Sequence, residues 1–248
     1  MFKMFNAKAS KVKDLKRAIE SISVLVDEGT LNISSNGIDV KVIDPSQIAM
    51  GILNIPKSMF EEYTVEGEKD LVAGMNFLEL SKLMKRARSD DTIELKIDNK
   101  IWIKFKGKTT RTYELGILET STPSREPKIE TVDEIKIAGN LFTDHVKDIE
   151  MVSSKIAIEI NDKGVLLSGE GDVSDVKIEI SDENLIEKNI KEDAKATFSI
   201  EYLKNLITAA DADTIISLKL KTNSPMVIEY SIGTGGIKYY LAPRIEGV

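Results

Sequence analysis

The sequence contains an internal repeat, and this feature limits the possible folds more than any other. Residues 77–87 and 200–210 are both amphipathic stretches, and each is soon followed by Asp-Thr-Ile. An offset of 123 residues aligns identical apolar residues of the two stretches: Leu80 with Leu203, Leu83 with Leu206, and Ala87 with Ala210. At an offset of 127, residues 31–37 also resemble residues 158–164. The repeat is too long for a solenoid unit, so it predicts two similar domains.

A proline-containing segment separates the two halves. Residues 119–130 hold two of the six prolines and few apolar side chains. Proline biases its preceding residue toward extended backbone, so this segment is typical of an extended linker. We therefore predict an N-terminal domain over 1–117, a connector over 118–130 and a C-terminal domain over 131–248. The length of 248 residues suits two domains of this size.

Apolar periodicity predicts two helices in each half, over 9–22, 76–88, 140–152 and 199–210. Asn76 with Glu79 three residues later resembles a capping box. The apolar stripes of the four helices are Val12, Leu15, Ile19 and Ile22; Phe77, Leu80, Met84 and Ala87; Phe142, Val146, Ile149 and Val152; and Leu203, Leu206, Ile207 and Ala210. Between the helices, runs such as 92–97 and 155–160 alternate apolar and polar residues, which favours antiparallel sheets with one wet face. The predicted class is α+β, with antiparallel sheets and two helices on one side in each domain.

The composition excludes several classes of enzyme. The chain has no cysteine and one histidine, which excludes disulfides, thiolate chemistry and multi-histidine metal sites. There is no phosphate loop, no dinucleotide fingerprint and no nucleophile elbow. The pairs Asp90–Asp91 and Asp211–Asp213 stand between a helix and a strand, where aspartate usually serves a turn. We expect no enzyme activity, no metal and no cofactor, and we expect a soluble intracellular protein without a membrane segment.

Basic residues are concentrated on the predicted helices although the chain is acidic. The formal net charge is −7, from 34 basic and 41 acidic residues. Lys13, Lys16 and Arg17 lie opposite the apolar stripe of the first helix, and Lys82, Lys85 and Arg86 lie opposite that of the second. The helix at 140–152 is acidic and the one at 199–210 is neutral. A basic face on an acidic chain indicates contact with a phosphate backbone, and no aromatic residues interleave it for base stacking.

The C-terminal run 238–246, Lys-Tyr-Tyr-Leu-Ala-Pro-Arg-Ile-Glu, resembles the C-terminal signature of the proliferating cell nuclear antigen family, the sliding clamps of eukaryotes and archaea. Further stretches are similar to the family in the same order, namely 34–37 before Ile43-Asp44, the helix segment 81–85, and 223–230. The resemblance spans the whole chain and is archaeal-like. It implies a DNA polymerase processivity factor that encircles duplex DNA, without sequence preference, as a homotrimeric ring.

The resemblance also implies where DNA is contacted. Matching channel positions, with further basic residues added from helical spacing, are Lys11, Lys13, Lys16, Arg17, Lys82, Lys85, Arg86, Arg88, Lys147 and Lys204. The chain departs from the best-known members at Asp14, Asp144, Glu201 and Thr208, where a basic residue might be expected.

The same resemblance implies two protein contacts. Short peptides of DNA polymerase, clamp loader, flap nuclease and ligase are expected in a pocket of Ile43, Gln47, Ile48, Met50, Pro127, Ile129, Pro225, Tyr240, Ala242, Pro243 and Ile245. Subunits are expected to pair the edge strands 109–115 and 173–181, through Thr109, Arg111, Tyr113, Leu115, Val176, Lys177, Ile178 and Glu179. Arg111, Lys177 and Glu179 would add ion pairs there.

Three alternatives remain open. Within the family, the chain could be one subunit of a heterotrimeric or checkpoint-type clamp. Outside it, a two-domain enzyme with an unrecognised site, or a monomeric DNA-binding module, would account for parts of the pattern. For a clamp we expect an intracellular location on DNA, in the archaeal cytoplasm and nucleoid or in a eukaryotic nucleus.

Overall fold

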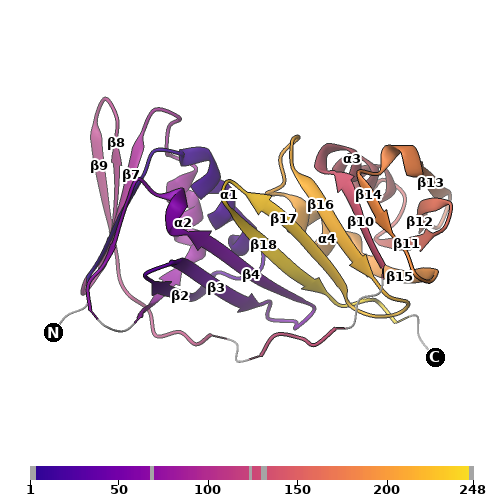
Figure 1. Cartoon of the computed structure of the whole chain (residues 1–248), viewed down its shortest axis with the longest axis horizontal. Helices are drawn as coiled ribbons and strands as arrows, with labels where there is room; N and C mark the ends of the chain where they lie inside the picture. Colours follow the sequence, from indigo (N-terminus) through magenta and orange to yellow (C-terminus); the bar gives the residue numbers. More distant parts are fainter. Residues whose placement is uncertain (1–3, 68–69, 123–124, 130–132, 246–248) are drawn as a thin grey trace. The chain divides into compact units, whose positions relative to one another are not determined.

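The structure is a computed structural model that describes residues 4–67, 70–122, 125–129 and 133–245. Figure 1 shows its helices and strands. The elements of the first half are β1 (Phe5–Ala9), α1 (Val12–Ser23), β2 (Glu28–Ser34), β3 (Gly37–Ile43), β4 (Ala49–Pro56), a 3-10 turn (Lys57–Met59), β5 (Glu62–Val65), β6 (Leu71–Asn76), α2 (Phe77–Met84), β7 (Thr92–Ile97), β8 (Ile101–Lys106) and β9 (Thr110–Leu115).

The second half repeats this order element for element. Its elements are β10 (Asp133–Ala138), α3 (Gly139–Glu150), β11 (Lys155–Asn161), β12 (Gly164–Glu170), β13 (Asp175–Ser181), a 3-10 turn (Asp182–Asn184), β14 (Glu187–Asn189), β15 (Ala194–Ser199), α4 (Ile200–Ile207), β16 (Ile215–Leu220), β17 (Met226–Ile232) and β18 (Gly235–Leu241). The sequence repeat is thus a duplicated α+β fold, and the predicted fold class is confirmed.

By spatial contacts the chain forms two compact units. The first comprises Met1–Ile43, Gly51–Ser124 and Ile232–Ile237, and the second comprises Asp44–Met50, Arg125–Ser231 and Lys238–Val248. Each unit therefore includes a short segment from the other half of the sequence. Residues 44–50, which precede and begin β4, belong to the second unit.

The first unit has two antiparallel groups of strands. One sheet has the order β5-β1-β7-β8-β9, and a second group has the order β4-β3-β2-β6. Helices α1 and α2 pack on one another. Side chains of both helices meet both groups of strands around a small apolar cavity lined by Leu15, Ile19, Leu80, Met84 and residues of β2, β3, β4, β6, β7 and β8. Both helices thus bury their apolar stripes in one core.

The second unit has the corresponding arrangement. Its strands follow the orders β14-β10-β16-β17-β18 and β13-β12-β11-β15. Helices α3 and α4 pack on one another, and α3 also contacts β10, β11 and β12. The stripe residues Phe142, Val146, Ile149, Leu203 and Leu206 are all buried at 0–1% exposure, as the apolar periodicity predicts.

The helices are shorter than the apolar pattern predicts. Helix α1 begins at Val12 because residue 9 still belongs to β1. Helix α2 ends at Met84, and the next residues form tight turns in which the Arg86 and Ala87 amides donate to Leu83 and Met84 carbonyls. Ala87, Val152 and Ala210 are consequently only half-buried. At the start of α2, the Glu79 amide donates to Asn76 Oδ1 at 2.8 Å, as in a capping box, while the Glu79 carboxylate accepts from Lys82 Nζ.

The predicted connector contains no helix or strand among its described residues. Leu118 forms one bridge to Gly74, where a Cβ would lie 2.1 Å from the Leu118 carbonyl oxygen. Glycine is therefore required at position 74 for this close approach. Thr120 hydrogen-bonds Thr30 at 2.7 Å, so the beginning of the connector runs along the first unit. Within the described residues, no helix is both long and apolar enough to cross a membrane.

Candidate functional site

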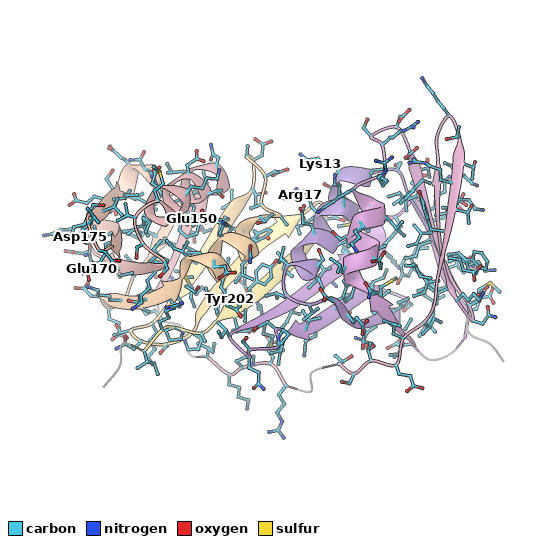
Figure 2. The ribbon with its side chains drawn as sticks, turned by 180° about the vertical axis from the view of Figure 1, so that it is seen from behind. Lys13, Arg17, Glu150, Glu170, Asp175 and Tyr202 are labelled. Atoms are coloured by element: carbon cyan, nitrogen blue, oxygen red, sulfur yellow. The ribbon has the colours of Figure 1, made fainter. Side chains whose placement is uncertain are left out.

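Helix α1 carries the first group of predicted DNA-facing residues. Lys13 and Arg17 are one helical turn apart and project from the same side of α1 (Figure 2). Lys11 precedes the helix and is exposed like Lys13, whereas Lys16 and Arg17 are half-buried. Amphipathic spacing places these cations opposite Leu15 and Ile19, which the core buries. The helix thus presents a basic face to solvent.

The end of α2 carries the second group. Lys82, Lys85, Arg86 and Arg88 are all exposed. Lys82 pairs with Glu79 at 2.7 Å. Among the described residues, Lys85, Arg86 and Arg88 have no acidic partner within 4 Å, and this region presents uncompensated positive charge. An exposed pair such as Lys82–Glu79 contributes about 0–1 kcal/mol, so it leaves Lys82 able to bind a phosphate at small cost.

Helices α3 and α4 differ from α1 and α2 in net charge. Lys147 of α3 pairs with Asp144 at 3.2 Å, and Lys204 of α4 is ion-paired with Glu150 of α3. His145 Nδ1 lies 3.6 Å from Asp148. The two lysine pairs are exposed like Lys82–Glu79, but the two helices carry four carboxylates (Asp144, Asp148, Glu150 and Glu201) against two lysines, so the helix pair is net negative.

A buried ion pair fixes the loop that follows α2. Asp91 is 2% exposed. It accepts a hydrogen bond from the Arg88 amide at 2.8 Å and forms an ion pair with Arg111 of β9. Arg111 also donates to the Arg86 carbonyl at 2.8 Å and lies over the Phe105 ring. The hydrogen bond from the Arg88 amide and the nearby guanidinium lower the pKa of Asp91. Arg111, predicted to form ion pairs between subunits, is thus engaged within its own chain.

The predicted peptide pocket lies almost wholly in the second unit. Met50 and Tyr240 are buried, and Ile48, Ile129, Pro225, Ala242 and Pro243 are half-buried. Gln47, Pro127 and Ile245 are exposed, Ile245 to 85%. The Ala242 amide donates to the Ile48 carbonyl at 2.9 Å, which joins the segment after β18 to the segment before β4. Ile43 is the one predicted member assigned to the first unit.

A polar contact attaches the connector to the predicted peptide pocket. Glu126 accepts hydrogen bonds from the Tyr240 hydroxyl and from Lys238 Nζ, the latter at 3.2 Å. Lys238 lies 3.6 Å from Glu229 as well. Burial and the Glu126 carboxylate raise the pKa of Tyr240, which therefore stays a hydrogen-bond donor at neutral pH.

A buried aspartate shapes the loop that bears two pocket residues. Asp44, 5% exposed, accepts from the amides of Ser46, Ile48 and Ala49 at 2.9, 2.7 and 2.5 Å. Its Oδ2 also accepts from the Tyr202 hydroxyl at 2.8 Å. Gln47, at the tip of this loop, has φ +58°. We call residues 44–49 the Asp44 loop.

The two strands predicted for subunit contact are both edge strands. β9 ends the sheet β5-β1-β7-β8-β9, and β13 ends the order β13-β12-β11-β15. Thr109 precedes β9. Arg111, Tyr113 and Leu115 are half-buried on one face of β9, as are Val176 and Ile178 on β13, while Lys177 and Glu179 are exposed. An unpaired edge of this kind is a template for another strand.

Sequence reasoning missed three residues of these surfaces: Asp44, Glu126 and Tyr202. An Asp-Pro dipeptide at 44–45 marks a turn, which was the available signal for Asp44. Glu126 and Tyr202 carry no local signal, because their partners Tyr240 and Asp44 are more than 100 residues away.

Comparisons with known proteins agree along the whole chain. The family model described as "Proliferating cell nuclear antigen, N-terminal domain" matches residues 4–111, and the corresponding C-terminal model matches residues 127–245. A DNA polymerase sliding clamp of Methanococcus maripaludis (strain C7) is 32% identical over 253 residues, covering 98% of this chain and 100% of the relative. The sliding clamp of Nitrosopumilus maritimus is 34% identical over 247 residues, covering 98% and 99%.

Solved structures show the same fold. The PCNA crystal structure from Thermococcus kodakaraensis superposes with a TM-score of 0.91 at 22% identity, covering 97% of this chain and all of that one. A. fulgidus PCNA, bound to the C-terminal region of FEN-1, gives a TM-score of 0.90 at 24% identity, covering 98% and 100%.

The family models and the curated relatives identify the duplicated α+β fold of this chain as that of a DNA polymerase sliding clamp. Such clamps are replication proteins without catalytic activity of their own. The chain belongs to the proliferating cell nuclear antigen family, with archaeal relatives of 30% identity or more over nearly its full length.

Proposed function

We propose that three copies of this chain close head-to-tail into a ring around duplex DNA. The observation that carries the proposal is the pair of unpaired edges, β9 in one unit and β13 in the other. In the repeat, β9 corresponds to β18 and β13 corresponds to β4. The backbone beside β18 and β4 already pairs within one chain, through the Ala242 amide and the Ile48 carbonyl. The equivalent pairing between β9 and β13 requires a second copy, and a repeated heterologous contact closes a ring.

The proposed ring holds DNA by phosphate contacts and tethers its partners by peptides. Lys11, Lys13, Lys16, Arg17, Lys82, Lys85, Arg86 and Arg88 supply positive charge without base readout. The cluster around Tyr240 and Pro243 takes the aliphatic and aromatic anchors of a short peptide, and the extended connector offers backbone for strand addition. DNA polymerase, clamp loader, flap nuclease and ligase are the proposed partners. Linkage to an encircled template raises a partner's effective concentration.

The domain bounds 1–117 and 131–248, joined by a connector over 118–130, belong to this proposal. They follow the sequence repeat, whereas the spatial units exchange two short segments. A ring that slides on DNA works where the template is, so we place the protein inside the cell on chromosomal DNA.

Light scattering behind a sizing column tests the ring directly. A mass of about 83 kDa, three times 27.5 kDa, is expected at low and moderate salt. A mass of 27.5 kDa for the chain alone would contradict the homotrimer and favour a clamp with different subunits. Retention on closed circular DNA supplies the topological test, because the same DNA after linearisation must release the ring from its ends.

A further inference from the structure

Several hydrogen bonds hold the Asp44 loop, most of them made by one side chain. One carboxylate binds three backbone amides of the loop, those of Ser46, Ile48 and Ala49. The Asp44 amide in turn donates to the Ala49 carbonyl at 3.0 Å, and the Gln47 amide donates to the Asp44 carbonyl at 2.9 Å. These contacts fix Gln47 in a left-handed conformation that a non-glycine residue rarely adopts. The loop is therefore rigid at the two positions, Gln47 and Ile48, predicted for the peptide pocket.

The Tyr202 hydroxyl completes this arrangement from helix α4. It donates to Asp44 Oδ2 at 2.8 Å, and both residues belong to the second unit. Figure 2 shows Tyr202 projecting from α4. Burial and the hydrogen bond to Asp44 raise the pKa of Tyr202, so its hydroxyl remains a donor. Helix α4 is thus bonded directly to the loop of the proposed peptide pocket.

This contact exists only once in the duplicated chain. The repeat aligns Tyr202 with Glu79 and Asp44 with Gly171. Neither the hydroxyl nor the carboxylate has a counterpart, so the contact is not required by the shared fold. A feature present in one copy of a duplicated fold points to a function that this copy alone performs.

We infer that Asp44 and Tyr202 are positioning residues for peptide binding: Tyr202 orients the Asp44 carboxylate, and Asp44 holds Gln47 and Ile48 in the conformation that receives a partner peptide. The inference rests on the proposed pocket. Its physical basis is preorganisation, since a loop already fixed in the bound conformation loses less entropy when a peptide binds. Neither side chain needs to touch the peptide.

Two variants with matched controls test the inference in the full-length protein. Tyr202→Phe removes one hydroxyl, and Asp44→Asn removes the charge. Tyr63→Phe is the first control, because its hydroxyl donates to the Ser34 carbonyl at 2.8 Å in the other unit. Asp133→Asn is the second, because Asp133 is 1% exposed and binds the Lys191 amide at 2.6 Å. Tyr63→Phe removes a hydroxyl contact, and Asp133→Asn removes the charge of a buried carboxylate that binds the amides of Lys191 and Glu192, neither of which is a predicted pocket residue.

The probe is a fluorescent peptide from the C-terminal region of A. fulgidus FEN-1, and its Kd is measured by anisotropy. We expect Tyr202→Phe to raise the Kd about three- to tenfold and Asp44→Asn to raise it about tenfold or more. Both controls should stay within about twofold of wild type. The mass in solution of all four variants should remain that of wild type.

Hydrogen exchange gives a readout that does not depend on any partner. In Tyr202→Phe, the amides of Ile48 and Ala49 should exchange several-fold faster, while amides of other loops keep their rates. Unchanged exchange together with unchanged Kd in Tyr202→Phe would overturn the inference, and so would equal weakening by the controls. If the peptide does not bind wild type, the proposed pocket itself fails and the inference with it. Faster exchange with an unchanged Kd would show that the loop is held but not for binding, which also refutes it.

Discussion

Phosphate contact should be concentrated on α1 and α2 rather than shared equally by the four helices. The perturbation that tests this is a pair of double variants, each removing two lysines: Lys82→Ala with Lys85→Ala on α2 and its end, and Lys147→Ala with Lys204→Ala on α3 and α4. The second pair lies on helices that are net negative, although each of its lysines, like Lys82, has a carboxylate partner. In the first, Lys85 has none within 4 Å among the described residues, and Lys82 has an exposed one.

The magnitude follows from counterion release. Each phosphate contact contributes about 0.9 to the slope of log affinity against log salt. Losing two contacts from the α2 group lowers that slope by about 1.8. Between 50 and 200 mM salt this corresponds to an affinity that falls about twelvefold less than that of wild type. The α3/α4 variant removes two positive charges from a helix pair that is already net negative, so its slope should change by less than about 0.5.

Equilibrium binding to a short linear duplex, measured by anisotropy between 50 and 200 mM salt, gives these slopes. Both double variants must keep the wild-type mass, so that a changed slope reports DNA contact and not ring loss. Equal slope changes in the two variants would refute the argument from the net charge of the helices. A larger change for the α3/α4 variant would reverse the assignment of the DNA-facing surface.

Three further outcomes are expected. In Asp91→Asn, the melting temperature should fall less steeply at acid pH than in wild type. Contacts lower the folded-state pKa of Asp91, so the stability that they add is complete above the unfolded pKa of about 3.9 and is lost as the pH falls through the folded pKa. Melting curves between pH 2 and 6 check this, and a wild-type slope in the variant would contradict it. Gly107→Ala should lower the free energy of unfolding by about 1–3 kcal/mol, because its Cβ would lie 2.3 Å from Asp91 Oδ1. Gly116→Ala, whose Cβ would meet no atom within 4 Å, should leave the free energy of unfolding unchanged, and urea titration of both variants measures the difference. Tyr240→Ala with Pro243→Ala should abolish polymerase stimulation while retention on circular DNA falls less, and retained stimulation would remove the pocket assignment.

Most of the fold was predictable because it depends on local periodicity and on the repeat. The stripes Val12–Ile22 and Phe142–Ile149 identify helices whose buried faces agree with the structure. The two halves were found because identical apolar residues recur at a constant offset. Helix ends were less predictable: Ala87 continues the apolar period, but the chain leaves the helix at Met84 so that Asp91 can bind the Arg88 amide. A contact with a buried aspartate overrode the local pattern.

The candidate sites were predictable where a residue type suffices and not where a partner is needed. A lysine on a polar helix face is visible in the sequence, but its compensation by a carboxylate on another helix, as for Lys204 and Glu150, is not. Arg111 shows the same limit. Its place on an edge strand suggested a subunit contact, while its guanidinium is committed to Asp91 within the chain. The hydrogen bond between Asp44 and Tyr202 joins residues 158 positions apart, and no periodic pattern in the sequence predicts such a pair.

Duplication explains why the fold and the sites differ so much in predictability. The apolar positions of the two halves are constrained by the same kind of core, so their pattern stays recognisable and predicts the fold in each half. The polar positions are free to diverge once the halves face different partners, and here they have diverged in charge and in bonding. Lys85 aligns with Thr208, Glu79 with Tyr202, and Gly171 with Asp44. In a duplicated clamp, function should therefore be sought at solvent-facing or loop positions where the two halves differ. Asp44 and Tyr202 are two such residues, and they also contact each other.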